Sequence, residues 1–256
     1  MEDGISISDF VEAVPFPATQ ALVQPPRTLG RLHALPPFPK AFNYVTAHNF
    51  FIWRFRKASL LPQGEIEKVF IRYEQVCAAY PCLDSDMVSC HSDLKPENIL
   101  FDGQRMWLVD WQAAFVNDRH FDLGVAANFL VTNDADEWTY LEQYFGQRPD
   151  EYQRARLFLM RQAVHMFYAA VFLLLGSVGK PIIQSENLPS FGDFHRRIWA
   201  DEVNLADNDL KILYGMVHWV QLLRNMQQPR FEEALGIVSE RHTRLEGVRL
   251  LLPSAP

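Results

Sequence analysis

Cysteine is scarce in this sequence, since only three of its 256 residues are cysteines. An odd count in a chain of this length does not fit a framework of disulfides. Cys77, Cys82 and Cys90 are also too unevenly spaced for a structural zinc site, even when His91 is added. We therefore expect reduced, partly buried thiols.

A basic excess is missing as well, because the formal net charge is −7. This charge argues against a general affinity for nucleic acid or for anionic membranes, and it is compatible with a cationic small-molecule substrate. The first ten residues, MEDGISISDF, are acidic where a secretion signal is basic and then apolar. The most apolar run, residues 157–176, is interrupted by Arg161, Gln162 and His165, so it predicts a buried helix. We expect a cytoplasmic protein without a membrane or nucleic-acid partner.

Hydrophobic residues make up 48% of the chain and charged residues 21%, which allows a sizeable core. The periodicity is mostly helical, with one exception. Residues 98–101 and 106–111 are short apolar runs on either side of Asp102-Gly103, a dipeptide typical of hairpin turns. We predict a mainly α protein with one small β-hairpin. The expected helices are 27–35, 64–80, 121–131, 134–145, 150–176, 204–226 and 230–246, with an irregular segment at 177–194.

The clearest chemical pattern lies in residues 90–112, CHSDLKPENILFDGQRMWLVDWQ. Within it, H-S-D-L-K-P-E-N fits H-x-D-L-x-x-x-N, the catalytic-loop pattern of kinases. Phosphoryl transfer depends on positioning and on electrostatic stabilisation, so one carboxylate must orient the acceptor hydroxyl and take its proton. Asp93 is the candidate for that catalytic role.

Two further residues of this stretch are candidate magnesium ligands. Mg²⁺ prefers oxygen atoms, and Asn98 and Asp110 stand at the ends of the two predicted strands, where both can converge on one ion. An isolated aspartate beside a strand is more often a turn or cap residue, so the register with Asp93 and Asn98 is what favours the metal role. We expect His91 to support the loop structurally. Lys95 can contact a phosphate or lie in solvent, and the sequence leaves both open.

These residues resemble the C-terminal lobe of the aminoglycoside phosphotransferase and choline kinase family, a branch of the protein-kinase-like fold. The resemblance is carried by HSDLKPEN, VDWQAAF, RHFDLGVAANF and LGRLHAL, and it is strongest from residue 88 to 130. It implies a mainly α (α+β) fold in which a small β-hairpin carries the metal-binding residues, with Mg²⁺ as cofactor and ATP as phosphate donor. It also implies that Asp93 is the base, that Asn98 and Asp110 hold the metal, and that Asp122 is a buried residue that fixes the catalytic loop.

A protein kinase is the nearest competitor, because DLKPENIL is typical of that group. Ser92 stands where a protein kinase has the arginine that binds a phosphorylated activation loop. Asp110-Trp111-Gln112 replaces Asp-Phe-Gly, and no Ala-Pro-Glu segment follows. These departures favour a small-molecule hydroxyl as acceptor.

The elements of a kinase N-terminal lobe are missing from the sequence before the motif. There is no glycine-rich strand pair, and the first lysine, Lys40, lies in the proline-rich PPFPKAF rather than in a strand. We therefore predict one domain, with residues 1–40 as a hinge-proximal segment with the first helix and 41–256 as a helical phosphotransferase lobe. One interpretation is a truncated phosphotransferase or one whose lobe a partner chain supplies; the other is an inactive binding module or pseudoenzyme. Either predicts an apolar surface on the side of the missing lobe, prone to association.

The acceptor is open among choline-like, aminoglycoside-like and sugar-like molecules. A quaternary ammonium favours an aromatic cage, for which Trp111, Trp199 and Trp219 are weak candidates. His165 and His218 lie in apolar helices and are interpreted as core histidines. An aminoglycoside favours carboxylates, which could come from Asp134, Asp136, Glu137, Asp201 and Glu202.

Overall fold

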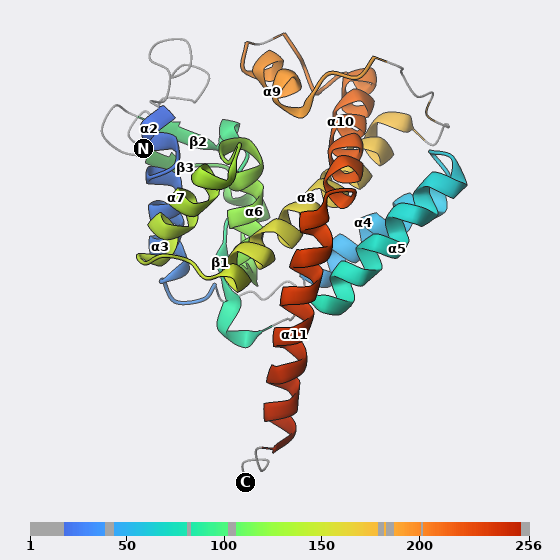
Figure 1. Ribbon diagram of the computed structural model, residues 1–256. Helices are drawn as coiled ribbons and strands as arrows, with labels where there is room; N and C mark the ends of the chain where they lie inside the picture. The colour runs from blue at the N-terminus through green and yellow to red at the C-terminus, as the bar shows by residue number, and fades with distance from the viewer. Residues whose placement is uncertain are drawn as a thin grey trace.

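The computed structural model describes residues 18–38, 44–80, 83–101, 106–178, 182, 187–200 and 202–251, and it is dominated by helices (Figure 1). The strands are β1 (Met87–Cys90), β2 (Ile99–Phe101), β3 (Met106–Leu108) and β4 (Phe115–Asp118). The helices are α2 (Ala18–Ala21), α3 (Gln24–His33), α4 (Tyr44–Ala58), α5 (Gln63–Ala79), α6 (Arg119–Leu130), α7 (Asp134–Phe145), α8 (Glu151–Ser177), α9 (Phe191–Trp199), α10 (Asn208–Met226) and α11 (Pro229–Leu251).

The predicted hairpin is present, since β2 and β3 pair antiparallel with Ile99 opposite Leu108 and Phe101 opposite Met106. Its Asp102-Gly103 turn lies outside the described residues. A second sheet was not predicted: β1 and β4 pair antiparallel, with Cys90 opposite Phe115. The predicted hairpin is therefore confirmed, and the β1–β4 pair, whose strands are joined by a long connection, is an additional sheet that the sequence analysis missed. The two sheets bracket the motif, because β1 ends immediately before His91 and β4 begins shortly after Asp110.

The helices predicted from periodicity are all found, with shifts of a few residues at some ends. The irregular segment at 177–194 was predicted too long, because α9 already begins at Phe191. Ser190 caps this helix: its hydroxyl oxygen accepts a hydrogen bond from the Asp193 backbone N–H. A serine cap satisfies one of the free N–H groups of the first helical turn, which explains why the helix starts there.

The long helix α8 runs through the centre of the molecule and separates two hydrophobic clusters (Figure 1). One cluster is formed with α4, α5, α10 and α11, and the other with α3, α6, α7, α9 and α10. Among the described residues, α8 alone is long and apolar enough to cross a membrane, but 61% of its most apolar 18-residue window is buried against the rest of the chain. The prediction of a buried helix is confirmed.

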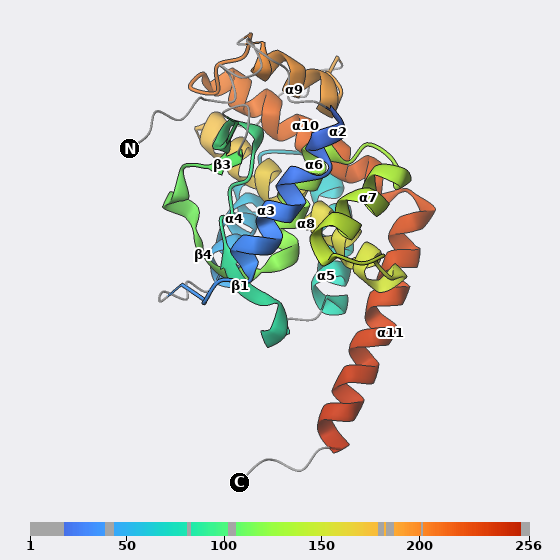
Figure 2. The ribbon, with the colours of Figure 1, turned by 90° about the vertical axis from the view of Figure 1, so that its left-hand side faces the viewer.

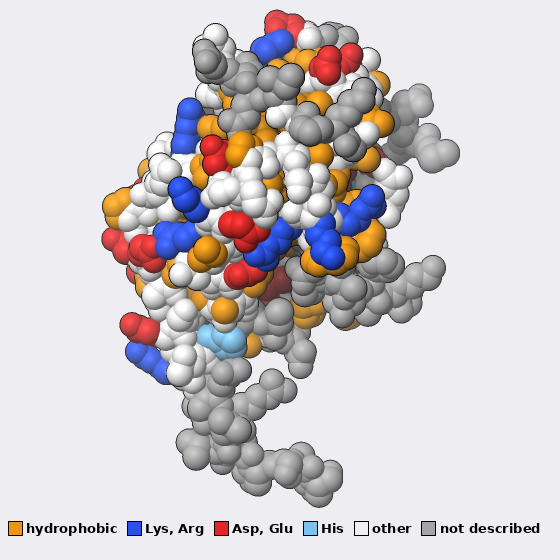
Figure 3. Space-filling view, turned by 90° about the vertical axis from the view of Figure 1, so that its right-hand side faces the viewer, with side chains coloured by type: hydrophobic (Ala, Val, Ile, Leu, Met, Phe, Trp, Pro, Cys, Tyr) orange, Lys and Arg blue, Asp and Glu red, His pale blue; other side chains and the backbone are white. Residues whose placement is uncertain are grey.

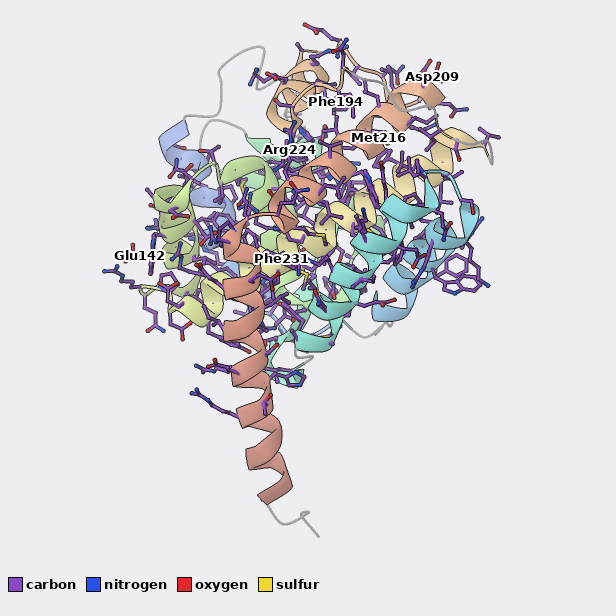
Figure 4. The ribbon with its side chains drawn as sticks, turned by 45° about the vertical axis from the view of Figure 1, so that its right-hand side comes forward. Glu142, Phe194, Asp209, Met216, Arg224 and Phe231 are labelled. Carbon is purple, nitrogen blue, oxygen red and sulfur yellow. The ribbon has the colours of Figure 1, made fainter. Side chains whose placement is uncertain are left out.

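Helices α9, α10 and α11 complete the core around α8. Phe194, Met216 and Phe231, one from each of these helices, are all buried (Figure 4). On the opposite side, α3 lies against β1 and α7, which brings the first helix next to the strand that leads into the motif (Figure 2).

Helices α8 and α10 approach each other closely at Gly215. A Cβ atom placed there would lie 2.7 Å from Leu173 Cγ and 2.9 Å from the Leu173 backbone nitrogen. Since backbone atoms cannot move aside cheaply, we expect Gly215→Ala to lower the free energy of unfolding by about 1–3 kcal/mol, measured by urea denaturation. Gly236→Ala in α11 is the control, because its Cβ would meet nothing within 4 Å. The control should gain up to about 1 kcal/mol from helix propensity, and equal effects of the two variants would contradict the close contact.

The face made by α4 and the end of α8 carries exposed hydrophobic side chains interspersed with Lys and Arg (Figure 3). Phe50 and Trp53 are each more than half exposed, and the side chains of Arg54 and Lys57 lie over their rings. A hollow of about 390 Å³ opens here between α4 and the end of α8. The sequence predicts an apolar association surface on the side where a missing lobe would pack. The structure does not identify the α4–α8 face with that side, so the association surface stays a prediction.

Candidate functional site

The motif forms a loop from His91 to Asn98 that connects β1 to β2, and Asp122 in α6 holds its beginning. Asp122 is fully buried, and its two carboxylate oxygens accept hydrogen bonds from the backbone N–H groups of His91, at 2.8 Å, and Ser92, at 2.7 Å. Ser92 adopts the left-handed conformation, with φ +65°. Because buried N–H groups need partners, one aspartate thereby fixes an otherwise strained turn.

A histidine outside the motif supports Asp122. His33, at the end of α3, places Nε2 at 3.1 Å from Asp122 Oδ2, and its Nδ1 lies 2.8 Å from the hydroxyl of Tyr144. A carboxylate can only accept, so in the neutral ring Nε2 donates and Nδ1 accepts from the tyrosine. His33 lies in the LGRLHAL segment that carried part of the resemblance, but no role was predicted for it.

His91 links the loop to the end of the hairpin. It is fully buried, and its Nε2 donates to the backbone oxygen of Val109 at 2.7 Å. Its Nδ1 accepts from the Asp93 backbone N–H at 3.4 Å, and its ring lies 4.7 Å from that of Trp111. These contacts tie Asp93 and the residue before Asp110 to one imidazole, and the supporting role of His91 stays a prediction.

Asn98 is oriented by the residue that the sequence assigns as the base. The side-chain nitrogen of Asn98 donates to the backbone oxygen of Asp93 at 2.7 Å and to Asp93 Oδ2 at 3.0 Å. Since only the amide nitrogen can donate, the amide oxygen points away from Asp93. The Asn98 backbone oxygen accepts from the Val109 N–H at 3.0 Å, so Asn98 and Asp110 lie at the same end of the hairpin.

Asp110 itself is exposed and adopts the left-handed conformation, with φ +64° and ψ +60°. A non-glycine residue held in this region costs about 1–3 kcal/mol, and such residues concentrate at functional sites. The Gln112 side-chain nitrogen donates to Asp110 Oδ2 at 3.4 Å. A carboxylate and an amide oxygen on one hairpin end form a donor set that suits a hard cation such as Mg²⁺.

Two other side chains reach the carboxylate of Asp93. Lys95 Nζ lies 3.3 Å from Oδ2, and the hydroxyl of Tyr168 in α8 donates to Oδ1 at 3.0 Å. Sequence reasoning missed Tyr168, because it lies in an apolar helix far along the chain. One chemical argument could have pointed to it: a tyrosine in a buried helix needs a hydrogen-bond partner for its hydroxyl.

Behind Tyr168 lies a buried group of three histidines. The Nδ1 atoms of His165 and His218 are 2.9 Å apart, and His195 Nε2 lies 3.1 Å from the Tyr214 hydroxyl. Burial lowers the pKa of His195 to about 4 and the pKa values of His165 and His218 well below 6.5. All three rings are therefore neutral at pH 7, and the interpretation of His165 and His218 as core histidines is confirmed.

The weak substrate candidates whose side chains are described, Trp111 and Trp219, differ in exposure. Trp111 is 41% exposed and packs edge-on against Phe38. Trp219 is buried in the core against Phe55, which leaves it no exposed surface for a ligand. The side chain of Trp199 lies outside the described residues.

The acidic candidates mostly serve helix caps and ion pairs. The Asp136 carboxylate accepts hydrogen bonds from the Thr132 backbone N–H and from the side-chain nitrogen of Asn133 at the start of α7, and Asp134 pairs with Arg154 and Arg230. Glu137 is buried and also pairs with both arginines. Glu202 faces Arg197, and Asp201 lies outside the described residues.

Cys77 is exposed and Cys90 is buried, both without a disulfide, and Cys82 lies outside the described residues. The donor atoms of His33, Cys90 and Asp122 lie within 4.8 Å of one another. Both oxygens of Asp122 already accept backbone hydrogen bonds, and burial raises the pKa of the Cys90 thiol. We interpret this group as a hydrogen-bonded support of the loop and not as a metal centre.

Comparison with known sequences matches the same region. The model of the family described as "Phosphotransferase enzyme family" (APH) matches residues 4–158, which is more than half of the chain. Protein LicA of Haemophilus influenzae is 27% identical over 142 residues, covering 51% of this chain and 36% of LicA. LicA of the H. influenzae Rd strain is 30% identical over 115 residues, covering 41% and 38%. The chain thus matches less than two fifths of the length of these curated relatives.

Solved structures show the same fold. A choline/ethanolamine kinase family protein from Mesorhizobium loti superimposes with a TM-score of 0.64 at 18% identity, covering 93% of this chain and 71% of that one. An ethanolamine kinase from Plasmodium vivax gives 0.56 at 14% identity, covering 91% and 65%. Choline kinase LicA from Streptococcus pneumoniae gives 0.53 at 18% identity, covering 82% and 64%. The predicted kinase-like, mainly α fold is confirmed.

Proposed function

This chain belongs to the phosphotransferase enzyme family, and we propose that it transfers the γ-phosphoryl group of ATP to the hydroxyl of a small molecule. One observation carries the proposal. Asp93 orients the amide of Asn98, and the Asn98 backbone pairs with the residue before Asp110, so a candidate base and two candidate metal ligands form one connected unit. Asp122 and His91 hold that unit in place.

Each residue then has a distinct role. Asp93 accepts the proton of the acceptor hydroxyl and orients that hydroxyl toward the phosphate. Asn98 and Asp110 would hold Mg²⁺, which when bound neutralises charge on the phosphate oxygens. For Lys95, whose side chain is 38% exposed beside Asp93, we propose a contact with a phosphate oxygen, which is one of the two roles that the sequence left open.

For the acceptor we propose a positively charged amino alcohol such as choline or ethanolamine. Asp93, the candidate base, brings a carboxylate to the position of the acceptor, and the chain has a formal net charge of −7; both are compatible with a cationic substrate. Two relatives named choline or ethanolamine kinase share the fold.

We further propose that the protein acts in the cytoplasm as one domain, with residues 1–40 leading into the lobe formed by 41–256.

A second candidate is a binding module that holds the acceptor but does not transfer phosphate. In the part of the chain that the structure describes, all four strands belong to the two sheets around the motif. None of them supplies the strand lysine that contacts the nucleotide phosphates in kinases. If the second candidate holds, choline binds but MgATP does not.

The test combines nucleotide binding with an acceptor screen. We expect calorimetry to show MgATP binding by the wild-type chain and an affinity at least about 10-fold lower for Asp110→Asn, because the variant loses a charged ligand. Asp209→Asn, at an exposed position in α10, should bind MgATP like the wild type.

In the acceptor screen, we expect ³²P transfer from ATP to choline or ethanolamine. Absence of transfer to these, to aminoglycosides and to sugars would refute the phosphotransferase function.

A further inference from the structure

The candidate base receives a hydrogen bond from a residue far from the motif. The hydroxyl of Tyr168 donates to Asp93 Oδ1 at 3.0 Å, across 75 positions of sequence. We propose that Tyr168 is a positioning residue, which fixes the carboxylate of Asp93 for the acceptor hydroxyl. This inference rests on the proposed role of Asp93 as the base.

The tyrosine is itself held firmly. Its side chain is only 6% exposed, and its ring stacks on His218 with centroids 4.9 Å apart and an interplanar angle of 19°. Tyr214 contacts the same ring edge-on. Burial, and then the negative charge of Asp93, raise the pKa of Tyr168, so the phenol stays protonated and can only donate to the carboxylate. A rigid donor on a packed helix positions a catalytic group better than a loop residue does.

The hydrogen bonds also distinguish the two oxygens of Asp93. Oδ2 faces both the Asn98 amide nitrogen and Lys95 Nζ, and each carboxylate oxygen has about two acceptor positions. Among the described residues, Oδ1 accepts only from Tyr168, so it keeps one position. The geometry therefore assigns Oδ1 as the atom that accepts the proton of the acceptor hydroxyl, beside the tyrosine.

The kinetic test removes one hydroxyl group. Tyr168→Phe keeps the ring and its stacking on His218, and Tyr214→Phe is the matched control. Tyr214 is equally buried in the same cluster, but its hydroxyl pairs with His195 rather than Asp93. We expect Tyr168→Phe to lower kcat about 10- to 100-fold, the value of one hydrogen bond to a charged group, with KM for MgATP and for the acceptor within about threefold. The control should keep kcat within about twofold.

A lower measured rate could come from a slower active site or from a smaller fraction of folded protein. The stoichiometry of MgATP binding, measured by calorimetry, counts the folded active sites and separates these two causes. A Tyr168→Phe variant whose kcat per active site stays within about twofold of the wild type would overturn the inference. Equal losses in Tyr168→Phe and Tyr214→Phe would also overturn it, because the effect would then follow from the cluster and not from the contact with Asp93.

A spectroscopic test needs no turnover. In the chain labelled with ¹³Cζ-tyrosine, we expect the Tyr168 signal, identified by its loss in Tyr168→Phe, to shift in Asp93→Ala, which removes the acceptor oxygen, and to stay in place in Asp209→Asn. An unmoved signal in Asp93→Ala would refute the hydrogen bond and with it the inference. A wild-type chain that transfers no phosphate would refute the proposed function, while the NMR comparison would still decide whether Tyr168 holds Asp93.

Discussion

Asp93→Asn is expected to lower kcat for phosphoryl transfer by about 10²- to 10⁴-fold, the usual contribution of a general base. Asparagine keeps the size of the side chain, and its oxygen can still accept from Tyr168, which donates to Asp93 Oδ1 in the wild type. What it loses is the ability to take a proton from the acceptor hydroxyl. The measurement is kcat with saturating MgATP and acceptor, with the unfolding midpoint determined in parallel.

Variants of other carboxylates test whether the loss of kcat is specific to Asp93. Asp209→Asn, at an exposed position in α10, should leave kcat within about twofold. MgATP affinity should fall less in Asp93→Asn than in Asp110→Asn, because Asp93 is not proposed as a metal ligand. An Asp93→Asn protein that retains more than a tenth of the wild-type kcat would show that proton transfer to Asp93 is not required.

The local part of the site was predictable because its information lies within a short stretch. Asp93 and Asn98 are close in sequence, and the hairpin that follows them needs only one turn, so spacing and strand pattern predict the arrangement. Asp122 could be named only through the family resemblance, since nothing in the residues around it shows that it accepts from the N–H groups of His91 and Ser92.

The contacts between distant segments could not be predicted in the same way. Strands β1 and β4 are only four residues long and show no apolar–polar alternation. They pair across more than twenty intervening residues, so no turn signal marks them either. Tyr168 and His33 meet the motif only because α8 and α3 pack beside it. Periodicity predicts that such helices are buried, but it does not predict which polar side-chain group forms a hydrogen bond with which partner.

The second prediction concerns stability. Arg156 in α8 is buried and pairs with Asp86 and with Asp118, whose Oδ2 lies 2.8 Å from the guanidinium. Burial alone would lower the pKa of Arg156, but Tyr80 and the two carboxylates raise it on balance, so the arginine remains charged. We expect Arg156→Met to lower the free energy of unfolding by about 3–5 kcal/mol, because both carboxylates lose their buried partner. Urea denaturation with two independent probes measures this change.

An exposed ion pair provides the control. Arg244 and Glu240 form an i,i+4 pair whose side chains are both more than two thirds exposed, so Arg244→Met should change stability by less than about 0.5 kcal/mol. A similar small effect of Arg156→Met would mean that the buried network contributes no more than a surface pair.

The pH dependence identifies the cause. In the wild type, burial raises the pKa of Asp118, but His120 and Arg156 outweigh it and hold that pKa below 3.8, so the contribution of Asp118 is present above pH 3.8 and is lost as pH falls. Without the arginine, a buried carboxylate has a raised pKa and destabilises the fold at higher pH. The stability difference between the two proteins should therefore shrink as pH falls toward about 4. A difference that stays constant with pH would assign the loss to packing around Arg156 and not to charge.

The network also connects stability to the site. Asp118 caps α6 by accepting from the His120 backbone N–H at 2.8 Å, and Asp122 lies one turn further along that helix. Arg156 thus holds the residue that begins the helix whose aspartate fixes the loop of Asp93. At a urea concentration where Arg156→Met is still folded, we expect its kcat to fall several-fold while Arg244→Met keeps the wild-type value. Unchanged kcat in Arg156→Met would show that Asp122 is positioned by the rest of α6 and not by its capped end.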